Sequence, residues 1–284
     1  NFIKSVNILQ AEASKRLVAP LTLPLWMPSL SNIKASMALK TIDKTVYDLI
    51  AESRSKKDCN HSLMSALIQA RDEETGDYLT DKEIRDQVVT LLTAGYETTA
   101  SSLAWLFFLL SQNSEVEKKL RYEVDTMLGN ETPNYQNISS MKYMRMVIQE
   151  SLRLYPPIWI FARTPIEADE LNGYSIPANS VVYISPLIVQ RHPKLWQSPE
   201  NFKPERFEAK TQTTDTDIAY IPFGAGMRSC IGRNFAIMMM QLLIPNILQR
   251  YRFILVPNQN IEPQYDITLH PKKAIYMKLE NNCN

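Results

Sequence analysis

Hydrophobic residues recur every three or four positions over several long stretches of the chain, the pattern of helices that bury one face. The longest such stretch begins at Thr80 and Glu83, a capping-box pair that starts a helix. It continues to about Ser111 with Gly95 as its interruption, and a helix of that length spans roughly 45 Å. The full set of expected helices covers residues 1–18, 33–55, 62–71, 80–111, 115–128, 144–155 and 232–251.

Other stretches lack this periodicity and carry turn or strand signals instead. Three prolines predict a loop at 19–31. The region 167–185 combines Asn172-Gly173 with β-branched residues, which is typical of short strands joined by tight turns. Further strands are expected at 253–256 and 275–279. The pattern therefore predicts a mainly α fold with small β-sheets in its second half, formed by residues 1–284 as a single domain.

Composition and charge exclude several classes of protein. The 284 residues are 45% hydrophobic and 21% charged, as in an ordinary globular protein. A formal net charge of +1 gives no reason to expect nucleic acid or an acidic membrane as a partner. The cysteines Cys59, Cys230 and Cys283 form neither a disulfide framework nor a zinc pattern, so a reducing compartment, the cytoplasm, is expected.

The chain holds no apolar stretch near the roughly 20 residues that a membrane-spanning helix requires. It begins with Asn1 rather than methionine, so we expect a piece of a longer protein. The possibility that a preceding segment holds a membrane anchor stays open.

The strongest chemical signal surrounds Cys230, in the segment Phe223-Gly-Ala-Gly-Met-Arg-Ser-Cys-Ile-Gly232. Glycines such as Gly226 let the backbone approach a flat ligand closely. The guanidinium of Arg228 can neutralise a carboxylate. A helix that starts after the cysteine favours the thiolate, and a thiolate is one of the ligands that haem iron accepts. The alternative is a buried, inert cysteine in a glycine-rich turn.

This segment resembles the haem-binding signature of the cytochrome P450 family, F-x-x-G-x-R-x-C-x-G, at all five specified positions. The resemblance implies that Cys230 is the axial ligand of haem iron, that Arg228 holds a propionate, and that Phe223 and Gly226 contact the haem. Methionines stand at 238–240, where the family has an acid, which puts the local electrostatics in doubt. The family's Trp-x-x-x-Arg helix is absent, so the resemblance implies a P450 fold that lacks its N-terminal part.

A second motif, Ala94-Gly95-Tyr96-Glu97-Thr98-Thr99, lies in the long helix. Small residues let a flat cofactor lie against the helix, and an acid beside a hydroxyl can pass protons to a bound ligand. Packing within the helix is the alternative. The motif resembles the family's oxygen-activating motif, which implies that Glu97 and Thr98 deliver protons while Ala94 and Gly95 lie against the haem.

Glu150 and Arg153 are three residues apart on one helix, a spacing common in surface ion pairs. Together with Pro204-Glu205-Arg206-Phe207 they resemble a family pattern, which implies a buried structural triad of Glu150, Arg153 and Arg206. Arg163 matches the position of a second propionate partner, and a solvated arginine on a strand is the open alternative.

The resemblance also implies an apolar substrate cavity above the haem. Its expected lining residues come from the long helix, from the segment after Pro156-Pro157 and from a later turn: Leu91, Leu92, Ile158, Ile160, Phe161, Ile267 and Thr268.

The implied function is a monooxygenase that inserts one oxygen atom of O₂ into an apolar organic substrate. With 7 glycines and no G-x-G-x-x-G, the chain lacks a flavin or nicotinamide fingerprint, so electrons are expected from a flavoprotein reductase or ferredoxin near Arg233. Two alternatives stay open: a haem-thiolate peroxygenase or isomerase, and a non-catalytic haem-binding fragment. The Glu97–Thr98 pair favours the monooxygenase.

Overall fold

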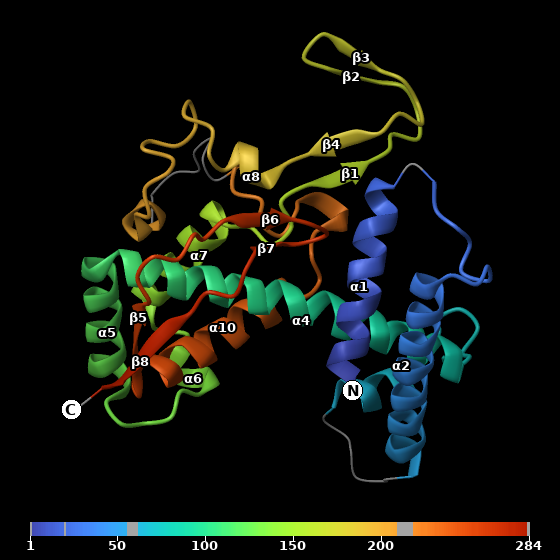
Figure 1. The fold of residues 1–284 in the computed structure, drawn as a ribbon, viewed down its shortest axis with the longest axis horizontal. Helices are drawn as coiled ribbons and strands as arrows, with labels where there is room; N and C mark the ends of the chain where they lie inside the picture. The colour runs from blue at the N-terminus through green and yellow to red at the C-terminus, as the bar shows by residue number, and fades with distance from the viewer. Residues whose placement is uncertain (1, 20, 56–61, 209–217, 283–284) are drawn as a thin grey trace. The chain divides into compact units, whose positions relative to one another are not determined.

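The computed structural model describes residues 2–19, 21–55, 62–208 and 218–282 (Figure 1). The chain forms two compact units, residues 1–96 and 97–284. Helix α4 (Asp81–Gln112) begins in the first unit and ends in the second. The organisation as a single domain therefore stays a prediction. Cys59 and Cys283 lie outside the described residues.

The first unit packs helices around a small apolar core. On α2, Ile42, Val46 and Ile50 follow one another at four-residue intervals and are all buried, so they form one apolar stripe that faces the core. The loop between the first two helices is tied down by Asn32, whose Nδ2 donates to two backbone carbonyls at 2.8 Å each. The helices of this unit are α1 (Phe2–Val18), α2 (Leu30–Ser55), α3 (Leu63–Gln69) and the first part of α4.

The capping box expected at the start of α4 is confirmed. The backbone N–H of Thr80 donates to the Glu83 carboxylate at 2.8 Å, and the backbone N–H of Glu83 donates to the Thr80 hydroxyl at 3.3 Å. Two backbone N–H groups near the helix start thereby gain partners, which is why the helix begins here.

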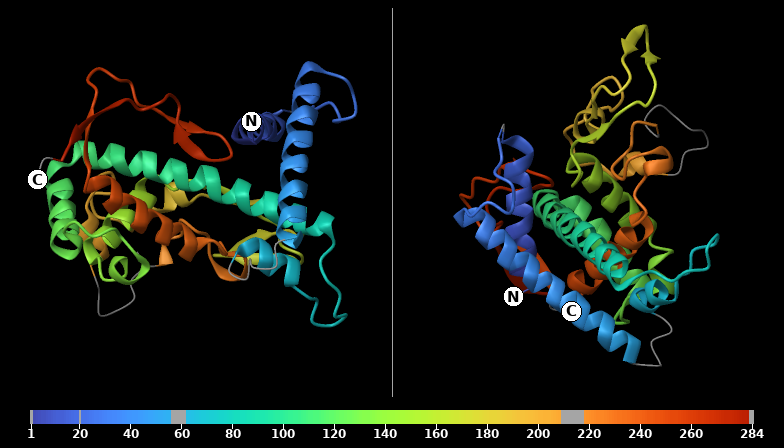
Figure 2. Two further views of the ribbon diagram at one scale, coloured as in Figure 1. Left: turned by 90° about the horizontal axis from the view of Figure 1, so that it is seen from below. Right: turned by 90° about the vertical axis from the view of Figure 1, so that its right-hand side faces the viewer.

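The second unit contains the larger core. It gathers apolar side chains from the last part of α4 and from α5, α7 and α10, among them the fully buried Leu120, Met144 and Ile244. Helix α10 lies alongside the part of α4 that belongs to this unit (Figure 2). The long helices here are α5 (Ser114–Leu128), α7 (Lys142–Leu154) and α10 (Arg233–Leu248).

Four two-stranded antiparallel sheets are present in the described part of the second unit. The turn at Asn172 and Gly173 has φ values of 52° and 85°, so this Asn-Gly pair makes the tight hairpin that the sequence predicts. The mainly helical fold with small sheets is confirmed. The paired strands are β1 (Phe161–Arg163) with β4 (Val182–Ile184), β2 (Asp169–Leu171) with β3 (Tyr174–Ile176), β5 (Tyr251–Leu255) with β8 (Met277–Asn281), and β6 (Pro263–Tyr265) with β7 (Leu269–Pro271).

Four short helical elements among the described residues did not emerge from the sequence pattern, because elements of three or four residues are too short to show a periodicity. Two of them are α-helical turns capped by side chains that accept backbone N–H groups, Asn134 and Ser185. Among the described residues, no helix combines the length and apolarity needed to cross a membrane. The short elements are α6 (Tyr135–Ile138), α8 (Pro186–Val189) and the 3₁₀ helices η1 (Pro204–Phe207) and η2 (Gly226–Arg228).

Candidate functional site

Residues 223–232, here called the cysteine loop, form a closed backbone turn before α10. The backbone N–H of Cys230 donates to the carbonyl of Phe223 at 2.9 Å and closes the loop. Gly224 and Gly226 have φ values of 71° and 69°. An L side chain is strained at such angles, so the two glycines are a requirement of this backbone path.

The Cys230 thiol is free and exposed at the entrance to α10. The helix starts at Arg233, and its first turn is established when the Ala236 N–H donates to the Gly232 carbonyl at 2.8 Å. A Cβ placed on Gly232 would lie 3.8 Å from the sulfur, an ordinary contact distance. The open sulfur is not the buried thiol that an inert packing role requires.

Apolar residues close to Cys230 in the sequence face solvent. Met227, Ile231 and Phe235 are 103%, 94% and 63% exposed. Exposed apolar groups gathered in one place are typical of a ligand surface. Arg228 lies beside them, exposed, and makes no hydrogen bond or ion pair with another described residue. A flat apolar ring that carries carboxylates fits this set: a thiol for the metal, apolar contacts for the ring and a guanidinium for a carboxylate.

Phe223 anchors the other end of the loop. Its ring is half-buried and packs against the large core of the second unit. The guanidinium of Arg233 lies 5.8 Å from the centre of that ring. The loop is thus held to the core on one side and open on the side of the thiol.

Glu150, Arg153 and Arg206 meet in one cluster, here called the charge cluster. Nε and Nη2 of Arg153 donate to the two carboxylate oxygens of Glu150 at 2.7 and 2.9 Å. Nε of Arg206 donates to the same carboxylate at 2.9 Å. The side chains of Glu150 and Arg153 are 0% exposed, and that of Arg206 is 11% exposed.

The backbone completes the charge cluster. The N–H of Lys203 donates to the Glu150 carboxylate at 2.8 Å, and Nη1 of Arg153 donates to the carbonyl of Gln190 at 2.7 Å. The Arg153 guanidinium also lies 5.1 Å from the Trp196 ring centre. Buried charges are stable only when their hydrogen bonds are made, and here the carboxylate is shared by two guanidiniums and a backbone N–H.

The acid–hydroxyl pair lies on α4 at the start of the second unit. Glu97 and Thr98 are both half-buried, and the Thr98 carbonyl accepts a hydrogen bond from the Ser102 hydroxyl at 2.8 Å. Ala94 and Gly95 are exposed and belong to the first unit. A Cβ on Gly95 would meet nothing within 4 Å in the described structure. The assembly of these four residues with Cys230 stays a prediction.

Arg163 lies on strand β1 and is exposed. Its Nη1 donates to the neighbouring carbonyl of Ala162 at 2.8 Å, and its guanidinium lies 4.7 Å from the Phe161 ring centre. Both are contacts with neighbouring residues of the same strand. Both interpretations of Arg163, propionate partner and solvated arginine, remain open.

Two of the expected cavity segments lie side by side. The N–H of Leu269 donates to the carbonyl of Pro157 at 2.8 Å, and the indole of Trp159 donates to the carbonyl of Asp266 at 2.9 Å. These bonds join the segment of Ile158, Ile160 and Phe161 to the turn of Ile267 and Thr268.

Burial differs among the expected lining residues. The Thr268 side chain is buried, and its hydroxyl has no hydrogen-bond partner within the described chain. Ile158, Ile160 and Phe161 are half-buried. Leu91 and Leu92 lie on the part of α4 in the first unit, half-buried and exposed respectively.

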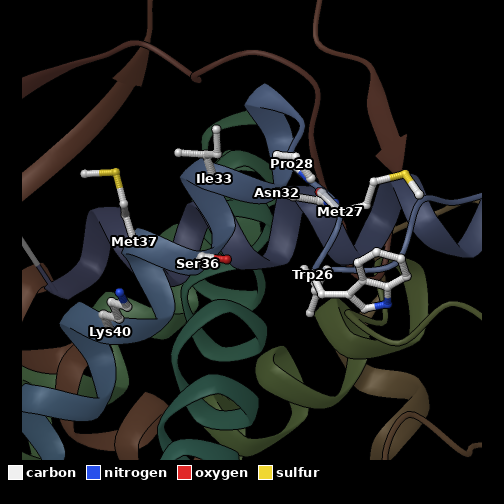
Figure 3. Close-up of a pocket in the computed structure, with 9 residues that line it drawn as sticks. Trp26, Met27, Pro28, Asn32, Ile33, Ser36, Met37 and Lys40 are labelled. Atoms are coloured by element: carbon white, nitrogen blue, oxygen red, sulfur yellow. The ribbon is translucent and has the colours of Figure 1, made fainter.

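A pocket of about 290 Å³ opens in the first unit, between residues 25–28 and 32–40 (Figure 3). Trp26, Ile33 and Met37 give it an apolar lining, and Lys40 adds a charge at its edge. It contains none of the residues that the sequence motifs single out.

Gln190 is a fully buried polar residue between the charge cluster and the segment that leads to the cysteine loop, and the sequence motifs missed it. A lone glutamine between Val189 and Arg191 carries no local signal of such a position. The resemblance found at the motifs also gives it no role.

Comparison with known proteins extends the likeness to nearly the whole chain. The cytochrome P450 family model matches residues 1–278. Cyclooctatin synthase of Streptomyces melanosporofaciens is 37% identical over 266 residues, which cover 93% of this chain and 58% of that protein. Pentalenene oxygenase of Streptomyces avermitilis is 34% identical over 253 residues, which cover 89% of this chain and 56% of that protein.

The solved structures agree with the sequences. The crystal structure of the cytochrome P450DA heme domain matches with a TM-score of 0.88 at 26% identity, over 99% of this chain and 61% of that one. The chain thus spans between about half and three-fifths of the length of the proteins that it resembles. On the family match and these likenesses, the chain belongs to the cytochrome P450 family and has part of the cytochrome P450 fold.

Proposed function

We propose that the protein is a haem-thiolate monooxygenase. In the proposed reaction one oxygen atom of O₂ enters a C–H bond of an apolar organic substrate, and the other leaves as water with two protons and two electrons. The observation that carries the proposal is the cysteine loop, because it presents an exposed thiol, exposed apolar residues and an exposed guanidinium with no partner among the described residues, just before a helix.

The residues of the loop suit the binding of haem. Cys230 would ligate the iron, Arg228 would hold a propionate, and Phe223 and Gly226 would border the ring. Haem ligated by a cysteine thiolate supplies oxygen binding and the cleavage of the O–O bond. Arg163 is the candidate for the second propionate.

Glu97 and Thr98 are proposed to move protons. A threonine hydroxyl can both accept and donate hydrogen bonds, so Thr98 would hold a proton at its Oγ1. The carboxyl group of Glu97, the next residue on the helix, can replace that proton. We propose that Ala94 and Gly95 leave room for the haem along the same helix.

The expected cavity residues favour an apolar substrate. Ile158, Ile160 and Phe161 offer no charge, and the Thr268 hydroxyl is a polar group without a partner within the described chain. The names of two relatives, cyclooctat-9-en-7-ol 5-monooxygenase and pentalenene oxygenase, support oxygenation of an organic compound. Electrons are proposed to come from a flavoprotein reductase or ferredoxin that contacts Arg233.

The test is the coupling of electron use to product formation in the full-length protein with a redox partner. Thr98→Ala should lower the yield of product per NAD(P)H and raise the yield of hydrogen peroxide, because proton delivery is impaired. Thr45→Ala is the matched control, since it removes a threonine hydroxyl within another helix, α2, where that hydroxyl donates to the Thr41 carbonyl at 2.8 Å.

Three results would change the proposal. Unchanged coupling in Thr98→Ala would favour a peroxide-driven enzyme or an isomerase. Product formation from hydrogen peroxide alone would point the same way. A full-length protein that binds haem but turns over no substrate with either oxidant would support the non-catalytic alternative.

A further inference from the structure

Gln190 makes three side-chain hydrogen bonds in a fully buried site at the end of α8. Its Nε2 donates to the carbonyls of Leu152 and Arg153 at 3.1 and 3.0 Å. Its Oε1 accepts the backbone N–H of Ile221 at 2.9 Å. The two carbonyls belong to the last turn of α7, where carbonyls have no partner within the helix.

The same residue also contacts the charge cluster through its backbone. Its carbonyl accepts Nη1 of Arg153 at 2.7 Å, and Arg153 in turn holds the Glu150 carboxylate. Gln190 is therefore bound to α7 at the residue that carries the buried positive charge. Movement of its amide would leave the carbonyls of the buried residues Leu152 and Arg153 and the N–H of Ile221 without this partner.

The third hydrogen bond leads to the thiol. Ile221 lies two residues before Phe223, and its carbonyl accepts the N–H of Gly224 at 3.0 Å. The carbonyl of Phe223 accepts the N–H of Cys230 at 2.9 Å. A continuous chain of hydrogen bonds and short backbone segments thus runs from the charge cluster through Gln190 to Cys230.

We propose that Gln190 is the positioning residue that sets the cysteine loop against the charge cluster. The geometry requires two N–H donors and one acceptor on the same side chain. A neutral primary amide supplies the two donors from its nitrogen and the acceptor from its oxygen. A carboxylate has no donor, an ammonium has no acceptor, and a thioether has no donor. This inference rests on the proposed haem-thiolate function, because its consequence is the position of the ligand sulfur.

The test replaces Gln190 by methionine in the full-length protein, which keeps the length of the side chain and removes its donors. The readouts are the absorption spectrum of the reduced, CO-bound protein and the reduction potential of the iron. We expect the share of molecules without a thiolate-type Soret band to rise about fivefold or more, as follows from unpaired buried backbone groups. The reduction potential of the remainder should shift.

Two controls separate positioning from loss of stability. Gln249→Met removes a similar amide, whose Nε2 donates to the carbonyls of Gly129 and Glu131 at 2.9 Å each, away from the cysteine loop. Leu120→Ala removes a fully buried core side chain on α5 and lowers stability without changing any hydrogen bond of Gln190 or of the loop. Both should keep the parent's Soret band and potential in the folded fraction.

Each outcome decides the inference. If Gln190→Met does not fold, Gln190→Glu is used instead. A protonated carboxyl keeps an acceptor for the Ile221 N–H and one donor for a carbonyl of α7. The share of molecules without the thiolate-type Soret band should therefore rise in Gln190→Glu too, but less than expected for Gln190→Met. A parent without a thiolate band would overturn the proposed function itself. A parent with that band and a Gln190→Met spectrum and potential equal to those of Leu120→Ala would overturn the role of Gln190 alone.

Discussion

Replacement of Arg153 by alanine tests the structural part of the account most severely. The guanidinium makes four hydrogen bonds: two to Glu150, one to the carbonyl of Gln190 at 2.7 Å and one to the carbonyl of Asn201 at 3.2 Å. Its loss leaves the fully buried Glu150 carboxylate with Arg206 and the Lys203 N–H as partners.

The cost follows from this burial. Removal of one partner from a buried ion pair costs about 3–5 kcal/mol, because a buried charge loses its compensation. Two backbone carbonyls also lose a guanidinium donor, which adds to the destabilisation. Since natural domains have about 5–15 kcal/mol of stability, we expect Arg153→Ala to lose most of its folded population and its haem.

Arg121→Ala is the matched control for Arg153→Ala. Arg121 donates to Glu117 at 2.9 Å and to the backbone carbonyls of Leu248 and Tyr251 at 2.7 and 2.9 Å. Its side chain is 15% exposed, so water can partly replace these bonds, and a smaller cost, about 1–3 kcal/mol, is expected.

The assay is haem content per polypeptide chain in full-length protein, together with urea unfolding followed by circular dichroism. Arg153→Ala should contain little haem and unfold at a much lower urea concentration than Arg121→Ala. An Arg153→Ala protein with normal haem content, and with no greater loss of unfolding free energy than Arg121→Ala, would refute the reasoning.

Three further substitutions address other parts of the molecule. The Thr80 backbone N–H holds the pKa of Glu83 below its ordinary value, so Glu83→Gln should be less stable than the parent at neutral pH, and the gap should close as the pH falls through the acidic range. Urea titrations at neutral and low pH check this, and a gap that does not change with pH would contradict it. Gly224→Ala places a side chain at a φ of 71° and should cost about 1–2 kcal/mol in unfolding free energy, with loss of the thiolate-type Soret band; a variant as stable as the parent would show that the loop tolerates a side chain there. Arg233→Glu should slow reduction of the iron by the external electron donor in stopped-flow measurements, and an unchanged rate would remove Arg233 from the docking surface.

The sequence predicted the long helices well, because their signals are local. The start of α4 is marked by Thr80 and Glu83, whose reciprocal hydrogen bonds the structure contains. The end of α7 at Leu154 lies just before Pro156-Pro157, where proline disfavours further helix. The buried face of α2 follows from a four-residue spacing of apolar side chains.

The parts that the sequence did not predict depend on contacts between distant segments. Glu150 meets Arg206 and the Lys203 N–H across more than fifty residues, and their association came from a family resemblance rather than from periodicity. Gln190 had no signal at all, since its partners lie on α7 and at Ile221. The exposure of Met227, Ile231 and Phe235, close to Cys230 in the sequence, likewise becomes visible only when the chain is folded.

The central claim is that Cys230 provides a thiolate ligand to haem iron. Its most direct test is the absorption spectrum of the reduced, CO-bound full-length protein beside its Cys230→Ser variant. We predict a thiolate-type Soret band in the parent and its loss in the variant. Bound haem without that band in the parent, or the same band in Cys230→Ser, would contradict the claim.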